Sequence, residues 1–170
     1  MLNIYLTNLG KYNEGELIGE WLNLPATDEE IEAVKERIGI NERYEEWFIT
    51  DYETDVNGLT VDEYDNLDEL NRLAEVIEDD PEGVAALIYF GYSDAEEIAD
   101  RLDDLIHIES SHMMSMDESI GYYYAEECGT IDSIPENLRS YFDYERYGRD
   151  IRLKGQFYET ESGDIIEFIG

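Results

Sequence analysis

The chain has 170 residues, and its 44 Asp and Glu against 11 Lys and Arg give a formal net charge of −33. This composition excludes a disordered acidic segment, because such segments are poor in aromatic residues whereas this chain is 42% hydrophobic and 12% aromatic. Nucleic acid and anionic membrane surfaces repel a protein of this charge, so we expect neither as a direct ligand.

The sequence also indicates a cellular compartment. The single cysteine, Cys128, cannot form an internal disulfide and fits a reducing environment. Residues 1–8 lack the basic and apolar stretches of a signal peptide. The longest apolar run, residues 84–90, is far shorter than the roughly 20 residues that cross a bilayer. We therefore expect a soluble cytoplasmic protein.

Three strands are predicted in the first third of the chain. Apolar residues alternate with polar ones over residues 2–8, as in a half-buried strand. Residues 9–15 contain two glycines and an asparagine, which suit a turn, and residues 16–24 form the next predicted strand. A third strand is expected over residues 46–52.

Capping-box spacing predicts four helix starts, because a Ser or Thr followed three residues later by Glu satisfies two free backbone N–H groups. These pairs are Thr27 with Glu30, Thr60 with Glu63, Ser93 with Glu96 and Ser115 with Glu118. Gly39 and Gly129 are predicted helix stops. Pro81 precedes a short apolar helix, and Pro135 opens a helix expected to continue through Tyr144.

The remaining predicted elements are strands in the last third. A short strand is expected at residues 105–109, and residues 151–160 and 165–169 form a hairpin through 161–164. The fold class is therefore α+β, as an elongated row of three small domains. These are an N-terminal β-β-α-β domain (1–59), a central acidic helical domain (60–104) and a C-terminal α+β domain (105–170).

The negative charge is concentrated in the middle of the chain. Residues 44–138 contain 28 acids and only two bases, Arg72 and Arg101, so they carry −26 of the −33. Adaptation to high salt would spread acids evenly. Duplex DNA carries one charge per ~1.7 Å, so 33 charges correspond to about 56 Å, or about 16 base pairs. The distribution favours imitation of DNA over salt adaptation.

The predicted mimic surface comprises the acids on the expected helices and at their ends. They are Asp28, Glu29, Glu32, Glu36, Asp62, Glu63, Asp65, Asp68, Glu69, Glu75, Glu78, Asp79, Asp80, Glu82, Asp94, Glu96, Glu97, Asp100, Asp103, Asp104, Asp117, Glu118, Glu126 and Glu127. Like charges three or four residues apart on a helix repel, and a solvated face would normally intersperse lysines.

Metal and enzyme signatures are weak. Residues 53–58 resemble the start of an EF-hand loop, but Tyr64 stands where the loop requires a bidentate Glu. His107 and His112 are five apart, outside usual zinc spacing. No nucleotide-binding or hydrolase motif is present, and Cys128 is interpreted as a packing residue. We expect no catalytic residues, metal or cofactor, with a salt-adapted or calcium-binding interaction domain as the alternative.

Tyrosines are enriched in the final third of the chain. Some are expected in the core, but tyrosine is also favoured at protein interfaces, where one end of the ring is wet. The candidates for a homodimer interface are Tyr122, Tyr123, Tyr141, Tyr144 and Tyr147.

Several segments resemble ArdA antirestriction proteins, in the same order. They are IYLTNLGKYNEGELIG (4–19), YEE (44–46), DYE (51–53), LDELNRL (67–73), IP (134–135), YFDY (141–144) and YGRD (147–150). The resemblance covers nearly the whole chain, and its most specific parts are the opening segment and YGRD.

The resemblance implies an inhibitor of type I restriction–modification enzymes, carried by a mobile element entering a bacterial cell. Such a protein would be similar to bent B-form DNA and would dimerise through its C-terminal domain, placing residues 141–150 near the dimer region. It would occupy the DNA groove of the specificity and methyltransferase subunits without catalysis, and block restriction and modification.

Overall fold

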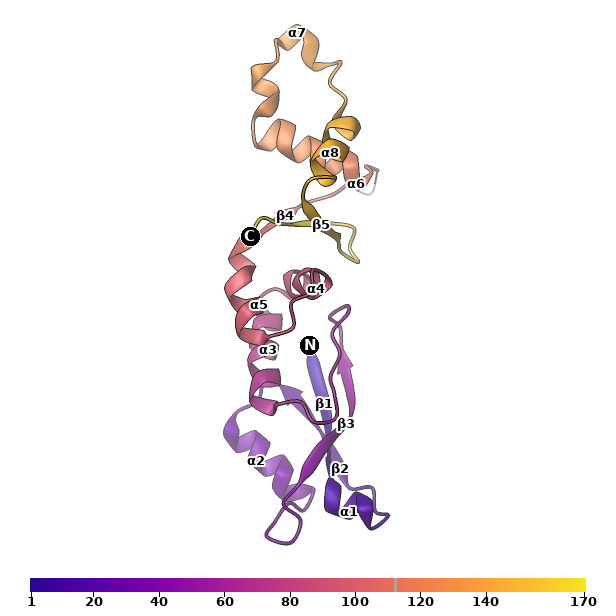
Figure 1. Ribbon diagram of the computed structural model, residues 1–170, viewed down its shortest axis with the longest axis vertical. Helices are drawn as coiled ribbons and strands as arrows, with labels where there is room; N and C mark the ends of the chain where they lie inside the picture. Colours follow the sequence, from indigo (N-terminus) through magenta and orange to yellow (C-terminus); the bar gives the residue numbers. More distant parts are fainter. Residues whose placement is uncertain (112) are drawn as a thin grey trace. The chain divides into compact units, whose positions relative to one another are not determined.

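The computed structural model describes residues 1–111 and 113–170. The protein is α+β, as predicted, with two small three-stranded sheets among its helices. Its internal contacts divide the chain into two compact units, Met1–Asp100 and Arg101–Gly170 (Figure 1). The division into three domains and their arrangement in a row remain predictions.

The first unit is built on an antiparallel sheet of order β2-β1-β3. Its strands are β1 (Leu2–Asn8), β2 (Gly19–Leu24) and β3 (Trp47–Thr54). The predicted strand over residues 2–8 is confirmed, and its alternation buries Leu2, Ile4 and Leu6 completely. β1 pairs with both β2 and β3 and is therefore the central strand of the sheet.

The segment after β1 differs from the prediction. Residues 9–15 were expected to form a turn, but Leu9–Asn13 form the short helix α1, and β2 starts only at Gly19. The buried Asn8 side chain explains the helix, since its Oδ1 accepts from Lys11 N at 2.9 Å while its Nδ2 donates to Ile38 O at 3.1 Å. This cap satisfies a free N–H and starts the helical turn.

Four further helices begin in the first unit: α2 (Asp28–Arg37), α3 (Leu67–Asp79), α4 (Pro81–Tyr89) and α5 (Ala95–Arg101). The capping box of Thr27 and Glu30 is confirmed, with both reciprocal bonds present. Gly39, with φ of +82°, follows α2 as the predicted stop, a conformation that favours glycine.

Two predicted helix starts are wrong. α3 is capped by Asn66, whose Oδ1 accepts from Asp68 N at 2.8 Å, and not by Thr60. The residues that precede α3 lie beside β3 instead, because Ile49 N donates to Glu63 O at 2.9 Å. Likewise α5 starts after Asp94, whose carboxylate accepts from Glu97 N at 2.9 Å, so the predicted cap Ser93 lies one residue too early.

The second unit contains the antiparallel sheet β4-β6-β5. Its strands are β4 (Leu105–Ile108), β5 (Gln156–Glu159) and β6 (Ile165–Phe168), and the hairpin between β5 and β6 is confirmed. β5 starts later than the predicted strand over 151–160 because residues 151 and 152 complete a helix. Ile108, Ile120 and Ile165 form the core of this unit.

The described residues of the second unit include six helical elements. They are η1 (Leu102–Asp104), α6 (Met116–Tyr122), the π-helical η2 (Tyr123–Glu127), η3 (Thr130–Ser133), α7 (Glu136–Arg139) and α8 (Tyr144–Arg152). The Ser115 cap is confirmed, since its Oγ accepts from Glu118 N at 3.1 Å. The prediction of one continuous helix from Pro135 through Tyr144 is wrong. The chain forms α7 and α8 as separate helices, because Asp143 caps the start of α8.

Two glycines let α6 and α8 approach each other closely (Figure 1). A Cβ on Gly121 would lie 1.9 Å from Tyr144 O, and one on Gly148 would lie 1.8 Å from Asp117 O. Backbone therefore packs on backbone, as only glycine allows. Arg152 and Asp117 join the same helices through an ion pair with Nε–Oδ1 of 2.5 Å.

Candidate functional site

The predicted acidic residues all lie in the described part of the chain, and none of them is buried. Most are exposed. The half-buried ones are Asp65, Asp80, Glu82, Asp104, Asp117 and Glu118. The acids of each unit are therefore accessible to a partner of opposite charge.

The helix α3 shows why the carboxylates point outward. Its apolar residues repeat at helical spacing, and five of them are buried: Leu67, Leu70, Leu73, Ala74 and Ile77. Packing this stripe against the core leaves Asp68, Glu69, Glu75, Glu78 and Asp79 on the solvent side. Its last turn contains no basic residue. The surface is thus a consequence of amphipathic helix packing.

Some of these carboxylates also stabilise the fold. Asp80 and Asp94 cap helices, while Asp117 pairs with Arg152. Glu32 pairs with Lys35 at 2.8 Å, Asp104 pairs with Arg101 at 3.1 Å, and Glu126 accepts from the Tyr144 hydroxyl. These acids therefore also have structural roles, which the sequence did not predict.

Five of the predicted acids meet in one open groove of about 710 Å³ in the first unit, named here the acidic groove. Its charged and aromatic lining consists of Asp28, Glu32 and Lys35 on α2, Trp47 at the start of β3, and Glu63, Tyr64, Asp65 and Asp68. Trp47 was predicted only as a strand residue and Tyr64 only as a mismatch to a calcium loop. Their adjacency depends on long-range packing and has no local sequence signal.

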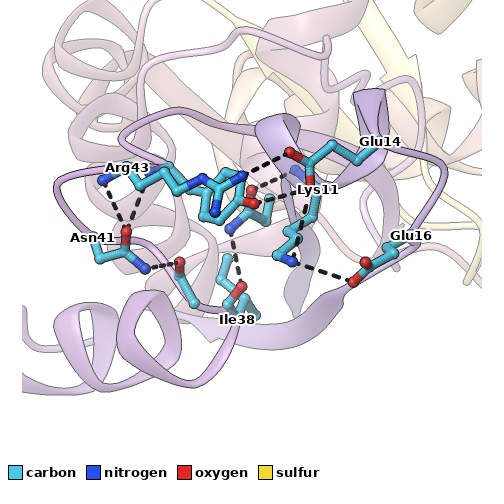
Figure 2. Close-up of polar contacts among 9 residues, drawn as sticks. Lys11, Glu14, Glu16, Ile38, Asn41 and Arg43 are labelled. Atoms are coloured by element: carbon cyan, nitrogen blue, oxygen red, sulfur yellow. Dashed lines mark hydrogen bonds and ion pairs between the residues drawn. The ribbon is translucent and has the colours of Figure 1, made fainter.

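A second polar cluster, shown in Figure 2, was not predicted. Lys11 Nζ lies 3.3 Å from Glu16 Oε2 and 4.8 Å from the Tyr44 ring centroid, and the bond to Glu16 raises the pKa of Lys11. Arg43 Cζ lies 5.0 Å from the same ring, whose hydroxyl donates to Glu14 at 2.9 Å. The cluster ties the loop after α2 to α1 through paired charges.

The tyrosines proposed for a dimer interface have different environments. Tyr141 is 83% exposed and Tyr122 is 44% exposed. Tyr123 packs against the core of the second unit, and Tyr147 contacts Phe142 edge-to-face at 5.3 Å. Tyr144 is half-buried, and its hydrogen bond to Glu126 raises its pKa to about 12. Tyr141 and Tyr122 thus offer the freest aromatic surface of the five.

The calcium-like segment is engaged in the fold. Asp55 Oδ1 lies 2.5 Å from the Met1 amino group, and the neighbouring Val56 is buried. Within residues 1–111 and 113–170, no group of three or more His, Cys, Asp or Glu side chains could hold a metal ion. His107 is exposed, and His112 lies outside the described residues.

No helix in the described part of the chain is both long and apolar enough to span a membrane. No curated protein matches the sequence. The family model described as "Antirestriction protein (ArdA)" matches residues 4–165, which is nearly the whole chain. A match of this extent confirms the resemblance of the opening and C-terminal segments, and the chain belongs to the ArdA antirestriction family.

Proposed function

We propose that the protein inhibits type I restriction–modification enzymes by presenting its acidic surface in place of DNA. The family establishes the antirestriction role and hence a restriction–modification enzyme as partner. The observation that carries the mechanism is the exposure of the predicted carboxylates, in a chain with a net charge of −33. Regularly exposed negative charge is what a DNA-binding groove recognises without reading bases.

In this proposal the inhibitor acts without catalysis or cofactor. It occupies the DNA groove of the specificity and methyltransferase subunits, in the cytoplasm of a bacterial host, and blocks modification as well as restriction. Association is steered by opposite charges and is therefore fast and sensitive to salt.

The same proposal includes a homodimer formed through the C-terminal region, within a row of three domains. Residues 139–170 contain seven acids and five bases, so two copies repel each other least there. Exposed Tyr141 is the aromatic side chain best placed to contact a second copy.

Competition between the full chain and a duplex oligonucleotide for a purified type I methyltransferase tests the mechanism. We expect the protein to displace the duplex, and its affinity to fall steeply as salt rises. Single acid-to-amide variants should each lose little affinity because the charge is distributed. Competition that is equal at low and high salt would rule out charge mimicry, and complete loss from one substitution would indicate a discrete site instead.

A further inference from the structure

We propose that the acidic groove binds an arginine side chain of the restriction–modification enzyme, and that it discriminates arginine from lysine. This inference rests on the proposed function and adds a specific contact to it. Imitation of phosphate charge requires carboxylates alone. The groove combines carboxylates with aromatic rings, which recognise the shape of a guanidinium group as well as its charge.

Hydrogen bonds connect the segments whose residues line the groove. Asn71 on α3 bonds to the residue preceding the α2 cap, since Ala26 N donates to Asn71 Oδ1 at 2.7 Å and Asn71 Nδ2 donates to Ala26 O at 3.0 Å. Ile49 N also donates to Glu63 O at 2.9 Å, which connects the segment that contains Glu63 to β3. The groove is therefore formed before any partner binds, which lowers the entropic cost of binding.

The groove already contains one cation of the chain itself. Lys35 Nζ lies 2.8 Å from Glu32 Oε1 and 5.8 Å from the centroid of the Trp47 ring. An ammonium group thus contacts a carboxylate and an aromatic face there, which is the arrangement expected for an incoming basic side chain. The lining contains this one lysine beside five carboxylates, so the groove keeps a net negative charge.

Arginine fits the remaining chemistry better than lysine does. Tyr64 is 71% exposed, and its ring centroid lies 6.3 Å from that of Phe48, so most of the Tyr64 side chain remains accessible to a ligand. A planar guanidinium can lie against such a ring while its N–H groups reach two carboxylates, such as Glu63 and Asp68. A lysine ammonium offers a point charge and no plane to stack.

The test uses Trp47 as an internal probe. The chain contains two tryptophans, so W21F leaves Trp47 as the only one. Hexaarginine and hexalysine amides are titrated into the full-length W21F protein at low salt, with tryptophan fluorescence as the signal. We expect saturable quenching by hexaarginine, with an affinity about three-fold higher than that of hexalysine.

Matched variants in the same background locate the effect. E63Q/D68N should weaken hexaarginine binding about five-fold. E96Q/E97Q removes the same charge from exposed residues of α5 and should change the affinity much less. Y64F should keep the preference for arginine and Y64L should lose it. Circular dichroism verifies that each variant is folded. If Y64L unfolds, the comparison of hexaarginine affinity between E63Q/D68N and E96Q/E97Q tests the arginine site instead.

The outcomes separate this inference from the proposed function. Unchanged Trp47 fluorescence, equal affinity for both peptides, or equal losses in E63Q/D68N and E96Q/E97Q would overturn the arginine site, even if the protein displaces DNA from the methyltransferase. Failure to displace DNA, with hexaarginine still bound in the groove, would overturn the proposed function and leave the arginine site standing.

Discussion

Glu167 on β6 is the only carboxylate that the described part of the fold buries, with 7% of its surface exposed. It accepts a hydrogen bond from the Tyr124 hydroxyl. Burial raises the pKa of Glu167, although this hydrogen bond acts in the opposite direction, and burial and the carboxylate together raise the pKa of Tyr124. Glu167, which lies opposite Ile106 on β4 and Phe157 on β5, thus buries a type of group that the other described residues of this kind keep at least partly exposed.

This burial predicts a pH effect on the second unit. Because the folded-state pKa of Glu167 is raised, its contribution to stability is fully present below the unfolded pKa of about 4.3 and is lost as pH rises through the folded value. E167Q removes the cost of the buried charge and keeps an acceptor for Tyr124. We therefore expect E167Q to raise the melting temperature by a few degrees at pH 7.5, and less at pH 5.

The matched control for this prediction is E159Q, which removes one exposed carboxylate from the neighbouring strand β5. Both variants reduce the overall repulsion equally, so only burial distinguishes them. Equal melting temperatures of E167Q and E159Q at pH 7.5 would show that Glu167 carries no burial penalty.

At the scale of elements, α3 places negative charge where it is unfavourable. Asp68 and Glu69 in the first turn complement the positive end of the helix dipole, whereas Glu78 and Asp79 in the last turn oppose the negative end. Helix stability alone would favour Lys or Arg at the latter positions. The presence of acids at these positions agrees with a requirement for charge at the surface.

This conflict predicts opposite effects of one charge change at the two ends of α3. E78Q should stabilise the protein by about 0.3–1 kcal/mol and E69Q should destabilise it by a similar amount. Both should weaken competition with DNA slightly, because each removes one exposed carboxylate. Chemical denaturation and the methyltransferase assay measure the two effects, and a gain in both stability and inhibition by E78Q would contradict a functional role for that acid.

At the scale of the whole molecule, the charge of −33 is tolerated because the described carboxylates other than Glu167 are at least partly exposed, where water and dissolved salt screen them. Each unit has its own apolar core, with Leu2, Ile4 and Leu6 in the first and Ile108, Ile120 and Ile165 in the second. We therefore expect folding by these cores to need neither high salt nor a bound cation.

Folding without high salt or calcium would distinguish a DNA mimic from a salt-adapted or calcium-binding protein. We expect the far-ultraviolet circular dichroism spectrum in low salt with a chelator to match the spectrum in high salt with calcium. The melting temperature should rise only gradually with salt, as repulsion is screened. Loss of the helical signal in chelator or in low salt would support the alternative.

Local signals explain which elements the sequence could predict. The Thr27 and Ser115 caps involve contacts over three residues, and the alternation in β1 is visible in adjacent positions, so these were predicted correctly. Thr60 had the same local signal as Thr27, but the bond between Ile49 and Glu63 places its segment beside β3 instead. A contact over 14 residues overrode the local preference.

The sequence by itself determined the amount of charge, the α+β class, the family and the outward position of the acids, because amphipathic periodicity decides which side of a helix is wet. Tertiary structure alone decided which acids come together. The acidic groove brings together Trp47, Tyr64 and five carboxylates from α2, β3 and residues 63–68, and contacts such as that of Asn71 with the backbone of Ala26, 45 residues away, connect these parts of the chain. No local pattern encodes such a contact, since its free energy arises only when the chain is folded.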